Sequence, residues 1–505
     1  MKLKKLKRQV AYSAVAGALA GVGMVGSAQA VILTPDGLGE VLIFPYYTVR
    51  NNQVTAFSVV NTTTNGKAVK VRFLEALNSQ EVLDFNLYMS PNDVWAATVT
   101  STSDGAQVNV ADMSCTTPII ATALGGSGSE PFRNSLYSTD ATTNHGNDRT
   151  REGYIEVIEM GNIVPTFVVV TAGGVTFGGS ITHVAGVLTA AKCGALTTSW
   201  APGGILNGSA VGSVTANSGG LAGTAHIISP GEGTDISYEP SVLNAWSNLA
   251  AANHTGPGFV TPSLANVSPK ASTVFSAAGV AVTSTWLAQA AIDPVSAVLM
   301  TASQDNEYIT ATDLLAGTDW VVTFPTKRFH LTSTVRPFTQ TFTSTGSCDT
   351  VTPTVFGREE EMKTGNIDFS PTTTTTSSLC WEANVIRFGT NASADVLKST
   401  ATSMAISSSQ IFANGWMRLT FPSTAVTEAG VDVAPADGFD DAYTAAGAQV
   451  HQMYDDAALP MGAGGFRYAG LPAVGFAVIR YATSALNGYG AAFSHKAERA
   501  VTAAP

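Results

Sequence analysis

The sequence predicts a mainly β protein, made of antiparallel β-sandwich sheets of an immunoglobulin-like or jelly-roll-like kind with a few short helices. Segments in which apolar and polar residues alternate recur along the chain, and this period of two is typical of strands with one face toward water. Charged residues make up only 12% of the chain, about half the share in an average globular protein. Gly, Thr, Ser and Ala take their place, a composition that favours sheets over helices with charged surfaces.

Residues 1–30 have the pattern of a secretory signal peptide. An apolar stretch, Val10–Val25, is followed by Ala28-Gln29-Ala30, an A-x-A signature that predicts cleavage after Ala30. We therefore expect export by a Sec-type route and a periplasmic, cell-surface or extracellular location. The basic n-region that precedes the apolar stretch consists of Lys2, Lys4, Lys5, Lys7 and Arg8.

The charge of the mature chain argues against one class of partner. Cleavage would remove five of the 26 basic residues and no acidic ones, leaving 21 Lys and Arg against 37 Asp and Glu, a net charge of −16. Binding to phosphates requires a basic surface. We therefore expect no nucleic-acid partner.

An even number of cysteines in an exported chain predicts two disulfides, for which three connectivities are possible. We favour the pairing that is local in sequence, Cys115–Cys193 and Cys348–Cys380. Buried free thiols remain the alternative. No two cysteines have the C-x-x-C spacing of a zinc site.

The stretch "GEVLIFPYYTVRNNQVTAFSVVNTT" opens the predicted fold. It is expected to form two paired strands, Val41–Val49 and Val54–Val60, that turn at Asn51-Asn52. Pro45 cannot donate a ladder hydrogen bond, which places the first strand at a sheet edge or on a bulge. Tyr46 and Tyr47 should point to opposite faces of a regular strand.

Residues 31–120 are assigned to N-terminal β-sandwich strands. Alternation continues in "AVKVRFLEA" and "EVLDFNLYMS", so residues 41–111 are expected to form an antiparallel meander of about six strands. Residues 121–152 are rich in Gly, Ser, Thr and Asn and form a predicted polar loop.

Residues 153–315 are predicted to be a Gly/Thr-rich β region with two short helices. Between Gly161 and Gly231 the only charged residue is Lys192. The apolar run in this segment is interrupted by Pro165 and by paired glycines, so we expect no membrane span after signal cleavage. Buried β structure is favoured there, and a self-associating array of strands is the alternative.

Two segments of this region have helical patterns, and one has the pattern of a hairpin. "EPSVLNAWSNLAAAN" spaces its apolar residues along one stripe. "IDPVSAVLMTA" has Asp293 as the expected N-cap and Pro294 at the first helical position. "GLAGTAHIISPGEGTDISYEP" predicts a β-hairpin. Residues 316–505 form a predicted C-terminal β region, with strands in "DWVVTFPTKRF", "WEANVIRF", "GWMRLTFP" and "LPAVGFAVIRYA".

No catalytic or cofactor motif is apparent, and Ca²⁺ is the one metal for which the sequence offers candidate ligands. The acidic segment "VDVAPADGFDD" offers Asp437, Asp440 and Asp441 as calcium ligands, because Ca²⁺ prefers oxygen. Its spacing does not fit an EF-hand, and a solvated acidic loop is favoured. The histidines show no metal-ligand spacing and stand at His145, His183, His226, His254, His330, His451 and His495.

Aromatic side chains are the candidates for stacking on sugars. Each lies in or beside an apolar run, so core packing is the favoured interpretation. The candidates are Tyr46, Tyr47, Trp95, Trp200, Trp246, Trp320 and Trp416.

Several phrases resemble those of a group of uncharacterised exported or cell-surface proteins of proteobacteria. They include "LIFPYYTVRNNQVTAFSVVNTT", "GYIEVIEM", "DPVSAVLM", "TDWVVTFPTKRF" and "LCWEANVIRF". The resemblance implies export and an envelope location and carries no activity. We therefore expect a non-catalytic structural or interaction protein whose partners are itself or other envelope proteins. The alternative is an extracellular carbohydrate-binding protein or polysaccharide hydrolase.

Overall fold

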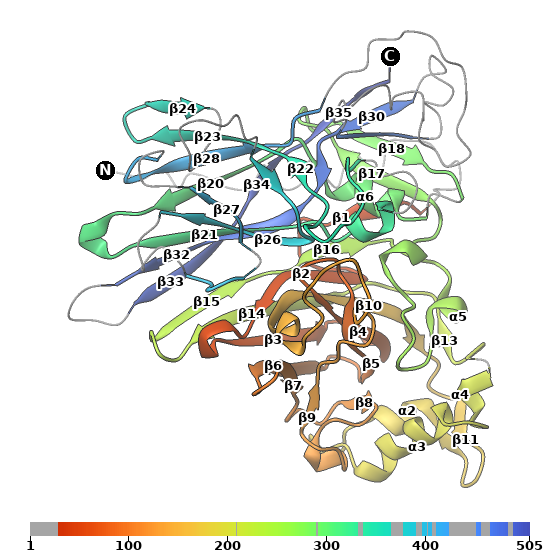
Figure 1. Cartoon of the computed structure of the whole chain (residues 1–505). Coiled ribbons are helices and arrows are strands. Elements are labelled where there is room, and N and C mark those ends of the chain that lie inside the picture. The colour runs from red at the N-terminus through yellow and green to blue at the C-terminus, as the bar shows by residue number, and fades with distance from the viewer. Residues whose placement is uncertain are drawn as a thin grey trace, which may run out of the picture.

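The computed structural model shows a mainly β chain in which most strands belong to antiparallel sheets, as the sequence predicts (Figure 1). It describes residues 29–504 except 209, 289–290, 332–336, 365–376, 390–395, 401, 407–410, 424–450, 456–464 and 483–487. The predicted signal peptide therefore lies almost wholly outside the described residues.

The first sandwich is formed by one sheet of eight strands and one of six. The larger sheet runs in the order β1 (Ile32–Leu33), β16 (Ser241–Asn244), β2 (Val41–Thr48), β10 (Glu152–Ile163), β4 (Lys67–Glu75), β5 (Glu81–Met89) and β8 (Cys115–Thr117), with β13 (Val214–Thr215) beside β10. The smaller runs in the order β15 (Thr234–Tyr238), β14 (Leu221–Ser229), β3 (Val54–Asn61), β6 (Val94–Ser101), β7 (Ala106–Asn109) and β9 (Ser129–Pro131).

Aromatic rings from both sheets meet in the core of this sandwich. Phe57 of β3 makes edge contacts with Phe44 of β2, Phe73 of β4 and Trp95 of β6, at centroid distances of 5.5–5.8 Å. Such edge-to-face pairs add to the burial free energy of the rings. The alternation of β3, with every second residue inward, follows from this packing.

The predicted pairing of the first two strands is wrong. β2 and β3 belong to different sheets, and each pairs with strands from far along the chain. β2 lies inside its sheet, between β16 and β10. Pro45 falls at a register shift against β10, so the predicted bulge is confirmed and the predicted edge is not.

The first sandwich also extends beyond residues 31–120. β10 follows the predicted polar loop and takes the position between β2 and β4. The predicted hairpin is confirmed as β14 and β15, and it completes the smaller sheet beside β3. Within the predicted loop at 121–152, the structure places η2 (Thr122–Leu124), β9 and η3 (Asn147–Arg151).

Part of the charge-poor segment is helical, which corrects the prediction of β structure there. It holds β11 (Val168–Val170), β12 (Val175–Thr176), α2 (Phe177–Ile181), α3 (Ala190–Trp200) and α4 (Ile205–Gly208). We call residues 164–213 the helical insert; it lies at one end of the first sandwich (Figure 1). The sequence does not predict α3, because the segment contains Thr and Gly, which have low helix propensity.

One predicted helix is confirmed and the other is only partly so. "IDPVSAVLMTA" forms α6 (Asp293–Leu299) with Pro294 in its first turn, although Ile292 rather than Asp293 is the N-cap. The segment expected to be the other helix begins as β16, because Val242 and Leu243 pair with β2. Only its end is helical, as α5 (Ala250–Asn253).

The second sandwich is formed by two five-stranded sheets. One runs β24 (Met362–Thr364), β23 (Thr352–Gly357), β28 (Asn414–Thr420), β20 (Ser303–Ile309) and β34 (Lys496–Glu498). The other runs β27 (Thr402–Ile406), β26 (Ala383–Phe388), β21 (Gly317–Thr323), β32 (Val474–Tyr481) and β33 (Tyr489–Ser494), with β27 parallel to β26.

Short sheets and turns complete the described chain. The paired short strands are β17 (Ala271–Phe275) with β18 (Ala281–Thr285), β19 (Met300–Thr301) with β31 (Leu471–Pro472), β22 (Asp349–Thr350) with β25 (Ser378–Leu379), and β29 (Gln452–Tyr454) with β30 (Phe466–Ala469) and β35 (Ala500–Ala503). The remaining single turns are η1 (Arg50–Asn52), η4 (Leu264–Asn266), η5 (Thr312–Leu314) and η6 (Lys327–His330).

β21 belongs to two cores at once. Val321 is part of the hydrophobic cluster of the first sandwich, whereas its neighbours Trp320 and Val322 belong to that of the second. The hydroxyl of Thr323 donates to the carbonyl of Pro45 in β2 at 2.6 Å. β21 is therefore buried on both faces, and its sheet joins the two sandwiches.

Both predicted disulfides are present. Cys115 in β8 is bonded to Cys193 in α3, and Cys348 is bonded to Cys380. The first fastens the helical insert to the larger sheet. A search of the described helices finds none with the length and apolar character needed to span a membrane.

Candidate functional site

Buried ion pairs line the outer face of the larger sheet in the first sandwich. Arg72 of β4 is fully buried, and its guanidinium donates to Glu81 and Glu156 at 2.6 Å each. Lys67 pairs with Glu159 at 2.7 Å on the same strands, β4 and β10. Burying charges is costly unless each is paired and hydrogen-bonded. These pairs therefore fix the register of β4, β5 and β10.

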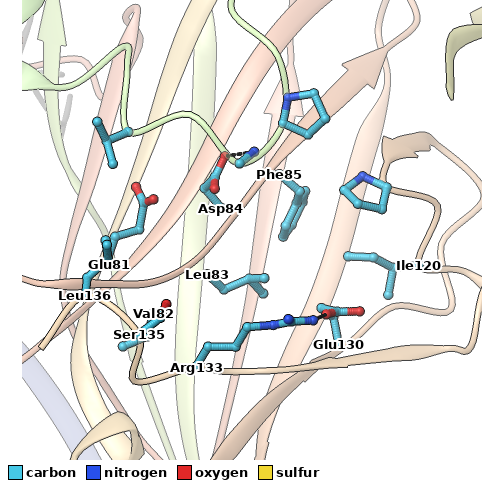
Figure 2. A pocket seen from close by; sticks show the side chains of 14 residues that line it. Glu81, Val82, Leu83, Asp84, Phe85, Ile120, Glu130, Arg133, Ser135 and Leu136 are labelled. Atoms are coloured by element: carbon cyan, nitrogen blue, oxygen red, sulfur yellow. Dashed lines mark hydrogen bonds and ion pairs between the residues drawn. The ribbon is translucent and has the colours of Figure 1, made fainter. Parts of the chain in front are cut away.

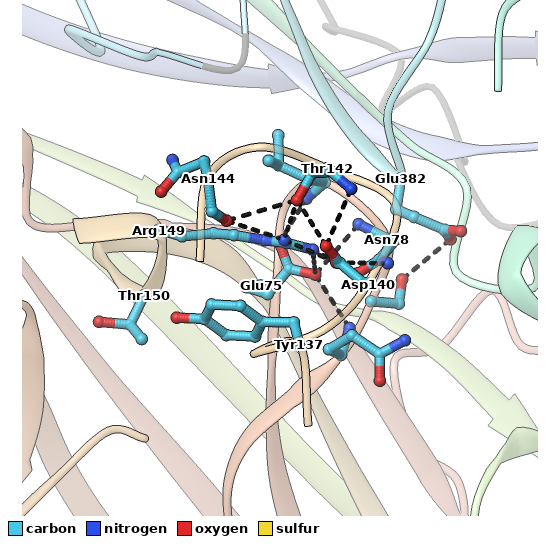
Figure 3. Close-up of polar contacts among 12 residues, drawn as sticks. Glu75, Asn78, Tyr137, Asp140, Thr142, Asn144, Arg149, Thr150 and Glu382 are labelled. Atoms are coloured by element: carbon cyan, nitrogen blue, oxygen red, sulfur yellow. Dashed lines mark hydrogen bonds and ion pairs between the residues drawn. The ribbon is translucent and has the colours of Figure 1, made fainter. Parts of the chain in front are cut away.

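A second ion network holds the predicted polar loop against β4. Arg149 in η3 donates through Nε to Glu75 Oε2 at 2.6 Å and through Nη1 to Asp140 Oδ2 at 2.7 Å. Its guanidinium also lies 4.3 Å from the ring centroid of Tyr137 (Figure 3). Asn78 and Thr142 complete the contacts around the same guanidinium. The donors of Arg149 are thus occupied by the chain itself.

Glu152, the first residue of β10, joins the two sandwiches. Its carboxylate accepts hydrogen bonds from Arg50 Nε at 3.2 Å and from the hydroxyl of Tyr46 at 2.7 Å, both on the first sandwich. It also accepts from Ser399 Oγ at 2.6 Å and from the backbone N–H of Thr400 at 3.0 Å. Removing this carboxylate would leave buried donors from both sandwiches unsatisfied.

A cavity of about 290 Å³ lies above these two networks; we call it the Trp381 cavity. Trp381 is half-buried, and it is the one indole that lines this cavity. The other lining residues come from five stretches of the chain: Arg50, Ala76, Leu77, Thr142, Thr143, Asn144, Arg149, Glu152, Ser344 and Thr400. The cavity therefore exists only when both sandwiches are folded together.

A second pocket, of about 370 Å³, lies beside β5 (Figure 2). Its apolar lining includes Leu83 and Ile120, and its rim carries the ion pair between Arg133 and Glu130 at 3.0 Å. Burial raises the pKa of Glu81 in this pocket, although Arg72 opposes the shift. The carboxylate of Glu81 already accepts a hydrogen bond from Arg72. It therefore stabilises the sheet and does not act as a free acid in the pocket.

The aromatic candidates from the sequence do not form a shared surface. Trp200 is half-buried, and its Nε1 donates to the hydroxyl of Tyr88 at 2.6 Å. Trp416 is half-buried and stacks on Phe356 with a centroid distance of 4.0 Å. The remaining five have no exposed surface: Tyr46, Tyr47, Trp95, Trp246 and Trp320.

Trp381, which lines the cavity, is missing from the sequence-based candidates. It follows Cys380 directly and lies between β25 and β26, outside any strand. Gly346 has φ +93°, and a Cβ there would come within 2.9 Å of the indole. A tryptophan next to a cysteine outside an alternating run is the signal that could have identified it.

The histidines remain scattered in the structure. His254 is fully buried with Nδ1 2.8 Å from Ser213 Oγ, and burial lowers its pKa to about 3. His330 has a similar contact, 2.9 Å from Ser296 Oγ, and burial again lowers its pKa to about 3. All four side chains are buried, so these Ser–His pairs cannot meet a substrate as they stand.

The calcium candidates Asp437, Asp440 and Asp441 lie outside the described residues. Among the residues that the structure describes, no group of three or more His, Cys, Asp or Glu side chains could hold a metal ion.

Comparisons with known proteins add no relative. No family model matches the chain, and neither the curated proteins nor the solved structures contain a significantly similar one. The fold and the cavities described above therefore carry the functional argument.

Proposed function

We propose that this chain is a non-catalytic structural and interaction protein of the cell exterior, either secreted or held in a bacterial envelope. One observation carries the proposal: the charged side chains around the described cavities are used to bind the chain to itself. Arg149 and Glu152 exemplify this, since each is buried and hydrogen-bonded by several partners. A catalytic acid or base needs a position from which it can reach a substrate.

Two further features support an extracellular role. Disulfides persist in oxidising compartments, and the four cysteines are all paired. The pattern of residues 1–30 is that of a Sec-type signal peptide.

Cell fractionation tests the location. The full chain with a C-terminal epitope would be expressed in a bacterium with two membranes, and cytoplasm, periplasm, surface and medium would be assayed. We expect a product shortened by about 30 residues outside the cytoplasm. Replacement of Ala28 and Ala30 by Arg is the matched control, which should block processing. An unprocessed cytoplasmic wild-type product would contradict the proposed location.

Self-association through the helical insert is part of this proposal. Val184 and Val211 are 65% and 69% exposed, and Lys192 is the only charged residue from 161 to 231. A neutral, apolar surface on an acidic protein is the place where two copies repel one another least. Size-exclusion chromatography of wild type and of Val184→Lys/Val211→Lys should show an assembly that the double substitution disperses. A strictly monomeric wild type would contradict self-association.

Carbohydrate binding is the second candidate, and the Trp381 cavity is the observation that favours it. A polysaccharide hydrolase panel separates binding from catalysis. We expect no cleavage of neutral or acidic polysaccharides, and release of reducing ends would contradict the non-catalytic role.

A further inference from the structure

The Trp381 cavity combines an indole with polar groups that the chain leaves without partners. Among the described residues, no hydrogen bond within the chain involves the hydroxyls of Thr143 and Ser344, the side-chain N–H groups of Asn144, or Nε1 of Trp381. Three separate segments supply these four residues, and all four line the same cavity. Thr143, Asn144 and Ser344 are exposed, so their polar groups are open to a ligand.

The floor of the cavity is charged but already neutralised. Arg50 pairs with Asp148 and Glu152, at 2.7 and 3.2 Å. Arg149 pairs with Glu75 and with Asp140. An anionic ligand would have to compete with these carboxylates for the guanidinium groups, at the cost of leaving a buried charge unpaired. The floor therefore favours a ligand without charge.

The position of the indole is fixed by its surroundings. Trp381 packs against the hydrophobic core of the first sandwich while remaining half-buried. Its main-chain N–H donates to Asn384 Oδ1 at 2.9 Å, and its carbonyl accepts from Asn384 Nδ2 at 2.7 Å. The neighbouring Cys380 is held by the disulfide to Cys348. Stacking of a ligand on this ring therefore costs little side-chain entropy, because the tryptophan is already ordered.

From this geometry we propose that the Trp381 cavity binds one ring of a neutral saccharide, which deepens the proposed interaction role and rests on it. A pyranose has an apolar face that suits the indole and a rim of hydroxyls that suits Thr143, Asn144 and Ser344. The volume of about 290 Å³ is at the small end of ligand pockets. The cavity is therefore suited to a terminal or side-branch sugar rather than to a long polysaccharide chain.

Binding to a glycan array followed by titration tests the proposal. The full chain would be screened on neutral and acidic glycans, and positive neutral sugars would be titrated while tryptophan fluorescence is recorded. We expect binding to neutral glycans that end in an accessible ring. Silence of the wild type across the array, or binding only to acidic glycans, would overturn the proposal.

Substitutions in the cavity identify the site. Trp381→Ala should weaken the neutral sugar about tenfold or more, and Asn144→Ala/Ser344→Ala should weaken it several-fold. Trp416→Ala is the matched control, because it removes another half-buried indole that lies in β28 and does not line the cavity. Thermal unfolding of each variant checks that it is folded. Equal affinity in Trp381→Ala, in the Asn144/Ser344 variant and in wild type would place the sugar elsewhere and overturn the proposal.

The outcomes for the two proposals are distinguishable. Loss of sugar binding leaves export and self-association unchanged and counts only against the cavity. Hydrolysis of a bound glycan would contradict the non-catalytic role while leaving the cavity in place.

Discussion

Glu40 shows at the scale of one residue how this chain uses a buried carboxylate. The residue is 2% exposed and precedes β2. Its Oε2 accepts the backbone N–H groups of Trp246 and Ser247, each at 2.9 Å. Burial raises the pKa of Glu40 to about 7, although these hydrogen bonds oppose the shift. The side chain therefore links the start of β2 to the segment that follows β16.

The raised pKa of Glu40 predicts a pH-dependent stability. Between about pH 4.5 and pH 7 the native state keeps a proton that the unfolded chain has lost, so the free energy of unfolding falls as pH rises. Across this pH range, the proton on Glu40 accounts for a fall in the free energy of unfolding on the order of 3 kcal/mol, and we expect Glu40→Gln to abolish that part of the fall. Urea unfolding at several pH values measures it. Glu307→Gln, at an exposed site, is the control; identical slopes for wild type and Glu40→Gln would refute the role of Glu40.

At the scale of elements, the sequence predicted where strands lie far better than how they pair. The alternation in β28 comes from one buried face, which is a local property and is visible in the sequence. β4 alternates in the same way but is buried on both faces, because Lys70 and Arg72 are paired with carboxylates. The pairing of β2 with β10 and β16 depends on residues more than 100 positions away. Nothing local distinguishes that arrangement from a hairpin, so the polar turn at Asn51-Asn52 predicts a strand pairing that does not form.

The same limit applies to the candidate site. The disulfide pairing could be predicted from spacing, and it was confirmed. The Trp381 cavity could not be predicted, because its lining spans residues 50 to 400. Tyr46 and Trp320 were candidates from their residue types alone, and burial decides against both.

The helical insert should depend on its disulfide. Cys193 is the covalent link between α3 and β8, and the bond closes a segment of 78 residues. Cys115→Ser/Cys193→Ser should cost roughly 2–5 kcal/mol of stability and open residues 164–213 to proteases. Limited proteolysis with mass spectrometry locates the cleavage sites. Cys348→Ser/Cys380→Ser is the control and should leave the insert protected; equal protection in both variants would show that packing alone holds it.

At the scale of the whole molecule, the two sandwiches share a sheet rather than merely a linker. Neighbouring residues of β21 point into different cores, and β32 repeats this arrangement with Val478 and Ala477. Glu152 and Thr323 add polar contacts across the same boundary. Loss of either core exposes one face of the shared sheet.

We therefore predict a single cooperative unfolding transition. Val321→Ala removes methyl groups from the first core and Val322→Ala from the second, and each should cost roughly 1–3 kcal/mol. Both should lower the temperature of the same calorimetric peak. Two resolved peaks, of which each substitution moves only one, would show that the sandwiches unfold independently.

The position of β10 and β16 in the larger sheet has a consequence for the order of synthesis. A ribosome, or a pore that passes an unfolded chain, delivers β2 about 110 residues before β10 and about 200 before β16. Until then β2 and β4 present unpaired backbone edges, and such edges join those of other chains. The nascent first half is thus an incomplete sheet until β10 and β16 have emerged. We expect its open edges to aggregate unless a chaperone covers them or the sheet is completed before two chains meet.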